Sequence, residues 1–127
     1  MKNIEYEYRN LPIPGGGYVT GFLFDQDREK VLYIRTDIGG CYRFSYENRH
    51  WDSLSESVNM FDLSETYPIA IATDLQQDET LYVISGINKE GTEGTFRISH
   101  DGGKTYTREM IPCFVHGNLN GRGTGYR

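Results

Sequence analysis

A repeat of about fifty residues constrains this chain more than any other feature of its sequence. Asp25 and Leu32 recur as Asp74 and Leu81, in both cases 49 positions later. Each copy holds several short β-prone runs separated by turn residues, and no long helical period interrupts them. A period near fifty residues with several strands per unit is typical of a β-propeller, whose sheets stack against their neighbours. The sequence therefore predicts an all-β fold built of propeller blades.

The repeat divides the chain into two blades and a remainder. The first unit covers about residues 15–60 and the second about 61–112, while 113–127 leads towards a third blade. We expect a four-stranded antiparallel sheet in each unit, so that 1–127 forms part of one propeller domain. The expected strands are Val19–Phe24, Val31–Arg35, Cys41–Ser45 and one around Trp51, followed by Ile69–Thr73, Leu81–Ser85, Thr95–Ser99 and one around Tyr106.

The later strands of the two units align with a larger offset. The run Gly40–Ser45 recurs as Gly94–Ser99, 54 positions later, so the second unit holds about five extra residues in the turn 88–94. A side chain that recurs in both copies is more simply explained by a structural role in each blade than by a role in a functional site. The pairs assigned to the scaffold in this way are Tyr42 with Phe96, Arg43 with Arg97, and Trp51 with Tyr106.

The second unit ends in an Asp-box, the hairpin motif S-x-D-x-G-x-T-W, here with a tyrosine in the last position. The motif runs from Ser99 to Tyr106. Ser99 and Asp101 can accept hydrogen bonds from turn amides, and the glycines between them and Lys104 can take positive φ. We therefore expect a structural turn at the surface with Tyr106 buried, and no catalytic role for Asp101.

Charge and composition exclude several classes of function. The net charge of −5 argues against nucleic-acid and anionic membrane partners, which need a concentrated basic surface. No run of 18 or more apolar residues is present, so no helix is expected to cross a membrane. The histidines and cysteines lack metal-ligand spacing, so we expect neither a metal nor a cofactor. Cys41 and Cys113 lie in apolar runs, where buried free thiols are favoured over a disulfide.

One carboxylate stands out from the repeat. Asp37 comes directly after an apolar strand and just before the turn Gly39–Gly40, where no bulky neighbour covers it. Taken alone, Asp37 would be explained as a turn residue that caps the strand. Under the 49-residue offset, however, Asp37 falls on Gly86, so the blade itself does not need an acid there. The scaffold therefore does not explain Asp37, which makes it a candidate functional residue.

The chain resembles the family 74 glycoside hydrolases, the xyloglucan-cleaving endoglucanases. The run Arg35–Gly40 followed by Tyr42 and Arg43 is similar to the catalytic motif of that family. The run Gly15–Gly21 resembles the entry to the first blade, and Asn118–Gly125 resembles the segment before the third. Family members hold two seven-bladed propellers that face each other across a cleft. The resemblance implies about two blades of such a propeller.

The resemblance also implies a function. It suggests a fragment of a secreted endo-β-1,4-glucanase that hydrolyses xyloglucan-type polysaccharide with inversion, although residues 1–7 lack the apolar core of a signal peptide. It assigns Asp37 the role of catalytic base, with the partner acid in the second propeller. The isolated chain is then expected to be inactive and to self-associate through uncovered blade faces.

Two tyrosines are the expected sugar contacts. Tyr18 and Tyr67 could stack on the apolar faces of sugar rings, and they are preferred because we expect neither to have an aromatic counterpart in the other copy. The alternative to an enzyme is a non-catalytic Asp-box module for carbohydrate or protein binding, which leaves Asp37 unexplained. A sialidase is a weaker third reading, because Arg43 and Arg97 are read as scaffold residues rather than a substrate-binding arginine cluster.

Overall fold

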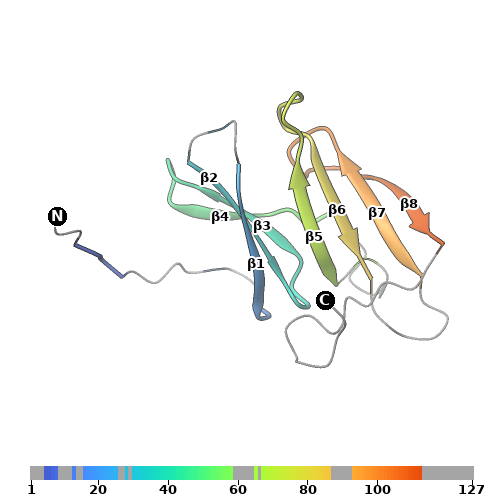
Figure 1. Cartoon of the computed structure of the whole chain (residues 1–127), viewed down its shortest axis with the longest axis horizontal. Coiled ribbons are helices and arrows are strands. Elements are labelled where there is room, and N and C mark those ends of the chain that lie inside the picture. Colours follow the sequence, from blue (N-terminus) through green and yellow to red (C-terminus); the bar gives the residue numbers. More distant parts are fainter. Residues whose placement is uncertain are drawn as a thin grey trace.

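The chain forms two four-stranded antiparallel sheets. The computed structural model describes residues 5–8, 13, 16–25, 28, 30–58, 65, 67–86 and 93–112. Each sheet is a simple meander in which every strand pairs with the next along the chain (Figure 1). The strands are β1 (Val19–Phe24), β2 (Val31–Thr36), β3 (Cys41–Ser45) and β4 (His50–Ser53) in the first sheet, and β5 (Pro68–Thr73), β6 (Leu81–Ser85), β7 (Gly94–Ser99) and β8 (Thr107–Ile111) in the second.

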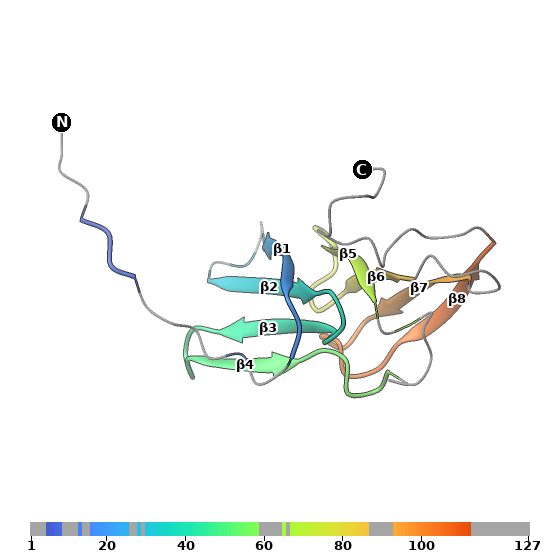
Figure 2. The same cartoon turned by 90° about the horizontal axis from the view of Figure 1, so that it is seen from below.

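The two sheets lie next to each other, with β2 of the first against β5 of the second (Figures 1 and 2). The expected all-β fold and its eight strands are confirmed, with small shifts at the strand ends. The last strand, β8, begins one residue after Tyr106. Both sheets form because their runs are rich in β-branched and aromatic residues between glycine, aspartate and serine turns.

The first two strands of each sheet share the same irregularity in their pairing. The pairing of β1 with β2 shifts between Val19 and Gly21, and that of β5 with β6 shifts between Pro68 and Ala70. These positions are 49 residues apart, as the sequence predicts. The bend therefore belongs to the blade scaffold rather than to either copy.

The offset predicted for the later strands is wrong by one residue. Leu32 pairs with Phe44 in the first sheet, and its counterpart Leu81 pairs with Ser99 in the second. Equivalent positions of the third strands, as defined by this pairing, are thus 55 residues apart rather than 54. The connection between the equivalent positions is therefore six residues longer in the second sheet, rather than about five. A slip of one residue moves every side chain of a strand to the opposite face.

This correction changes two of the pairs assigned to the scaffold. The structural counterpart of Tyr42 is Arg97, because these residues pair with Ile34 and Val83, respectively. Arg43 and Arg97 therefore occupy opposite faces of their sheets. The match of Trp51 with Tyr106 does follow the 55-residue offset. Trp51 is 2% exposed, as expected of a core residue, whereas Tyr106 is half-buried rather than buried.

Two hydrophobic clusters hold the structure together. One lies on the outer face of the first sheet and comprises Leu32, Ile34, Tyr42, Phe44 and Trp51, with Ile13 and Val19 packed against it. The second lies between the sheets and comprises Tyr33, Cys41, Leu54, Leu81 and Val83. Because successive side chains alternate between faces, β2 contributes to both clusters and is buried on both sides.

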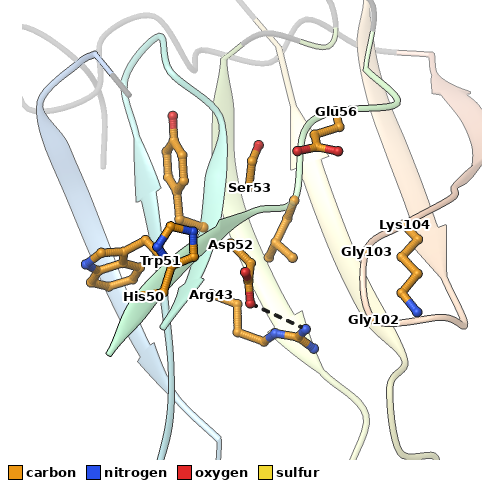
Figure 3. A pocket seen from close by; sticks show the side chains of 11 residues that line it. Arg43, His50, Trp51, Asp52, Ser53, Glu56, Gly102, Gly103 and Lys104 are labelled. Atoms are coloured by element: carbon orange, nitrogen blue, oxygen red, sulfur yellow. Dashed lines mark ion pairs between the residues drawn. The ribbon is translucent and has the colours of Figure 1, made fainter. Parts of the chain in front are cut away.

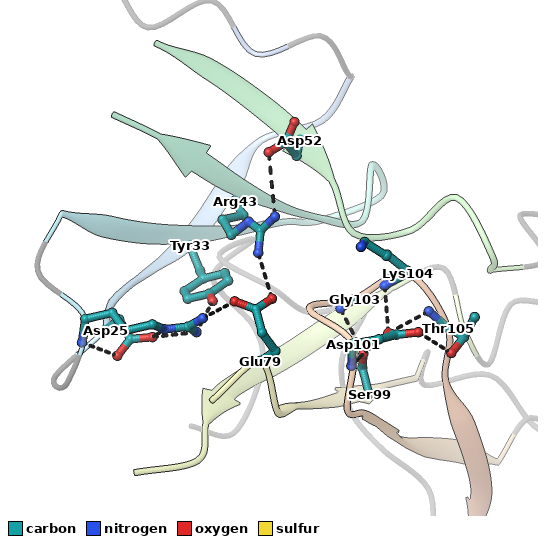
Figure 4. Close-up of polar contacts among 11 residues, drawn as sticks. Asp25, Tyr33, Arg43, Asp52, Glu79, Ser99, Asp101, Gly103, Lys104 and Thr105 are labelled. Carbon is teal, nitrogen blue, oxygen red and sulfur yellow. Dashed lines mark hydrogen bonds and ion pairs between the residues drawn. The ribbon is translucent and has the colours of Figure 1, made fainter. Parts of the chain in front are cut away.

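A chain of charged groups also joins the two sheets. Arg28 pairs with Asp25 at 2.8 Å within the first sheet and with Glu79 of the second at 2.5 Å. The other oxygen of Glu79 pairs with Arg43 at 3.2 Å, and Arg43 reaches Asp52 at 3.8 Å (Figure 4). Glu79 therefore bridges two arginines of the neighbouring sheet. Arg43 acts as a scaffold ion-pair residue, as expected.

The Asp-box forms the turn that its sequence predicts. Asp101 accepts hydrogen bonds from the amides of Lys104 and Thr105, and from the hydroxyl of Thr105 at 2.6 Å (Figure 4). The Thr105 hydroxyl is the main reason that the pKa of Asp101 lies well below its usual range. Gly102 and Gly103 have φ of 72° and 90°, a conformation that favours glycine. Asp101 is thus a structural residue.

The described cysteine is a buried thiol. Cys41 is 2% exposed and free, and burial raises the pKa of its thiol to about 12. Cys113 lies outside the described residues, and so does the expected lead-in at 113–127. A thiol with so high a pKa is protonated near neutral pH, so Cys41 serves as a small core residue.

Candidate functional site

Asp37 follows β2 directly and is bound to the residue just before β1. The amide of Asp37 donates to the carbonyl of Tyr18 at 2.9 Å, and the amide of Tyr18 donates to Oδ1 of Asp37 at 2.7 Å. The side chain of Asp37 is partly exposed. Within the described residues, no hydrogen bond occupies its second oxygen, Oδ2. Among the described residues, the carboxylate is therefore bound through Oδ1 alone. The interpretation of Asp37 as a capping residue explains the position of Oδ1 but gives no role to Oδ2.

The turn after Asp37 is fixed by Thr36 and two glycines. The buried hydroxyl of Thr36 accepts from the amide of Gly39 at 2.8 Å and donates to the carbonyl of Gly40 at 3.0 Å. A Cβ at Gly39 would lie 1.9 Å from the carbonyl oxygen of Gly16, so the two glycine segments are in close contact. Gly40 has φ of 88°. Hydrogen bonds and close glycine contacts thus constrain the backbone around Asp37.

The second blade repeats this backbone without the carboxylate. Gly86 donates its amide to the carbonyl of Tyr67 at 2.9 Å, as Asp37 does to Tyr18. The match of Asp37 with Gly86 is therefore confirmed by backbone geometry. It also shows that Tyr18 and Tyr67 are counterparts of each other, 49 residues apart. The reason given above for singling them out, that neither has an aromatic counterpart, is wrong.

The structure places the two tyrosines beside unlike neighbours. Tyr18 is 69% exposed and contacts Asp37 through its backbone, whereas the partly exposed Tyr67 lies next to Gly86. An exposed aromatic beside a carboxylate can take part in sugar binding, because its ring can stack on the apolar face of a pyranose. Tyr18 thus keeps a physical argument for this role that Tyr67 lacks.

A groove of about 700 Å³ lies elsewhere, between β4 and the Asp-box turn. Arg43 and Asp52 face it from the first sheet, and Lys104 faces it from the second (Figure 3). A smaller cavity of about 390 Å³ adjoins Arg28 and Glu79. Asp37 lines neither of them. Four of the polar side chains that line these cavities, Arg28, Arg43, Asp52 and Glu79, are members of the charged chain that joins the sheets.

Two residues of the charged bridge were missed in the sequence. Arg28 lies three residues after Asp25, a spacing that could have indicated the local pair. Glu79 gave no signal, because its partners come from the other blade and meet it only through packing. Among the described residues, no group of three His, Cys, Asp or Glu side chains could hold a metal ion, and no helix is long and apolar enough to span a membrane.

The two sheets are blades of a β-propeller, and one of them carries a carboxylate that the scaffold does not require. Comparison with known proteins shows which proteins the chain is similar to. The chain is 33% identical over 122 residues to a probable oligoxyloglucan-reducing end-specific xyloglucanase of Neosartorya fischeri, and 32% identical over 126 residues to a xyloglucanase of Paenibacillus. Each alignment covers 96% of this chain, but only 15% and 12% of the relative. No protein-family model matches the chain.

Solved structures agree with these relatives. The GH74 xyloglucanase of Xanthomonas campestris superposes with a TM-score of 0.76 and 32% identity, over 97% of this chain and 18% of that one. The GH74 enzyme of Niastella koreensis gives a TM-score of 0.65 at 28% identity, over 86% and 16%. The chain is therefore a homologue of the family 74 xyloglucanases and corresponds to a short part of them.

Proposed function

We propose that this chain supplies the general-base half of a site that hydrolyses a xyloglucan-type β-1,4-glucan with inversion. The observation that supports the proposal is the position of Asp37. Its backbone matches that of Gly86, yet it adds a carboxylate that is bound at Oδ1 and has no hydrogen bond at Oδ2 within the described residues. The homology to xyloglucanases supports the substrate class.

The chemistry needs two carboxyl groups. In an inverting glycosidase, a base takes a proton from water as the water oxygen attacks the anomeric carbon, and an acid protonates the departing oxygen. Oδ2 of Asp37 can accept the proton from water. The acid must stand roughly 6.5–9.5 Å from the base to leave room for that water. We assign the acid to a part of the complete protein outside these two blades.

The remaining roles follow from this assignment. Tyr18 is proposed to stack on a sugar ring next to Asp37, and Tyr67 is a weaker candidate. A cell-wall polysaccharide is too large to pass through a membrane intact, so the complete protein is proposed to act outside the cell. The isolated chain is expected to leave xyloglucan uncleaved, because removal of an acid or base alone costs on the order of a hundredfold or more in rate, and positioning is lost as well.

A domain exchange tests the proposal. Residues 1–127 would replace the matching stretch of the Xanthomonas campestris GH74 xyloglucanase, and reducing ends released from xyloglucan would be measured. We expect the folded chimera to retain turnover within about tenfold of the host, while the isolated chain shows none. A chimera that unfolds as cooperatively as the host but does not cleave xyloglucan would favour the non-catalytic binding module instead.

A further inference from the structure

The contact between Asp37 and Tyr18 is reciprocal. Each residue donates its amide to an oxygen of the other: Asp37 to the Tyr18 carbonyl at 2.9 Å, and Tyr18 to Oδ1 of Asp37 at 2.7 Å. The first bond is part of the blade scaffold, because Gly86 and Tyr67 repeat it at the same length. The second bond needs a carboxylate and so belongs to the first blade alone. This bond from the Tyr18 amide to Oδ1 fixes the direction of the Asp37 side chain.

Gly17 makes this second bond possible. A Cβ at Gly17 would lie 2.8 Å from Oδ1 of Asp37, closer than real Cβ atoms approach, and 3.2 Å from Cβ of Thr36. Gly17 also has φ of 107°, which disfavours other residues. Its neighbour Gly16 differs, because a Cβ there would meet nothing within 4 Å. The missing side chain of Gly17 thus leaves the space that Oδ1 occupies.

We propose that Gly17 and the Tyr18 amide position the catalytic base, by holding Oδ1 so that Oδ2 is presented to the attacking water. Gly17 is then a positioning residue that acts through Asp37. The inference rests on the proposed function of Asp37. Its physical basis is the gain from pre-orientation: a base that is already aligned need not be ordered in the transition state, and a misplacement of about 1 Å can cost a hundredfold in rate.

The first test uses the 127-residue chain and measures amide hydrogen exchange of Tyr18 by NMR. We expect Asp37→Ala to speed exchange at Tyr18 at least tenfold, because the carboxylate acceptor is lost. Gly17→Ala should have the same effect, and Gly16→Ala should leave exchange within about twofold of the wild type. If Asp37→Ala leaves the exchange rate of Tyr18 unchanged, the bond does not exist in solution and the inference is overturned.

The second test places the same variants in the domain-exchange chimera and measures kcat and KM on xyloglucan. Gly17→Ala should lower kcat at least tenfold with KM within about twofold, at a temperature where circular dichroism shows the chimera folded. Gly16→Ala should change neither constant. A Gly17→Ala chimera with full kcat would overturn the positioning role of Gly17. The role of Asp37 as the base is tested separately, by Asp37→Asn. If Asp37→Asn itself keeps full kcat, it is the proposed function that fails.

Discussion

Asp101 shows how a carboxylate in this fold can be wholly structural. Its oxygens accept from Ser99, Lys104 and Thr105, and these bonds lower the pKa of its carboxyl group. A carboxylate with a lowered pKa in the folded state contributes stability above its unfolded pKa of about 4, and that stability is lost as the pH falls. Asp37, by contrast, has one hydrogen-bonded oxygen within the part of the chain that the structure describes.

We therefore predict that Asp101→Asn makes stability less dependent on pH. The free energy of unfolding from urea titrations should fall from pH 7 to pH 3 in both proteins, but less steeply in the variant. The exposed Gln76 provides the control, because Gln76→Ala changes no titratable group and should leave the slope as it is. Equal slopes for Asp101→Asn and the wild type would contradict the structural role of the Asp-box carboxylate.

Gly40 is a second residue whose role is structural, because its position requires a glycine. Its φ is 88°, and a Cβ there would lie 2.2 Å from Oγ of Ser55, which accepts the amide of Cys41. We predict that Gly40→Ala lowers the free energy of unfolding by about 1–3 kcal/mol, from backbone strain and a lost hydrogen bond. Gly16→Ala should change it by less than about 0.5 kcal/mol. Urea unfolding would measure both, and equal effects would refute the argument.

At the level of the strands, the sequence contains enough information to place all eight but not to pair them fully. The 49-residue offset around Leu32 and Leu81 predicts the match of Asp37 with Gly86, and the structure shows that the register of the first two strands and their shared bulge follow the same offset. After the turn that follows β6, which is longer than its counterpart after β2, the similarity of Gly40–Ser45 to Gly94–Ser99 gives an alignment that is wrong by one residue. Side-chain resemblance does not report which face a strand buries.

The same limit applies to the site. Asp37 could be singled out as a candidate because the repeat provides an internal comparison. The Asp-box could be predicted because its whole pattern is local. The clamp on Oδ1 could not be predicted, since it depends on how closely Gly17 approaches Asp37, residues 20 positions apart. Glu79 could not be predicted either, because its two arginine partners belong to another sheet.

The bridge through Glu79 leads to a prediction for the pair of sheets. The Glu79 side chain is 47% exposed, so solvent screens its ion pairs with Arg28 and Arg43. We predict that Glu79→Gln lowers the free energy of unfolding by about 1 kcal/mol in low salt and by less in 1 M NaCl. Glu56→Gln is the control for an exposed carboxylate, and a loss that does not depend on salt would argue against the bridge.

On the scale of the whole molecule, the two blades leave apolar side chains uncovered. Phe22 and Phe24 of β1 pair with Ile34 and Leu32, so they share the outer face of the first sheet, and they are 67% and 65% exposed. Exposed aromatic side chains on a blade face favour contact with another apolar surface.

We predict that the purified chain self-associates through this face. Its mass by sedimentation velocity should rise with concentration, and Phe22→Asp should shift the association to at least tenfold higher concentration. Leu75 is 60% exposed and lies in the turn after β5, so Leu75→Asp serves as the control. A wild-type chain that stays monomeric at all concentrations, or equal effects of the two substitutions, would contradict the prediction.

The central claim is that Asp37 is the base of a xyloglucan-hydrolysing site, and the kcat of one substitution tests it most directly. Asp37→Asn in the domain-exchange chimera keeps the shape of the side chain but removes its ability to accept a proton. We predict that kcat on xyloglucan falls at least a hundredfold, in line with the loss of general-base catalysis, with an unchanged unfolding temperature. A folded Asp37→Asn chimera that retains its kcat would contradict the account.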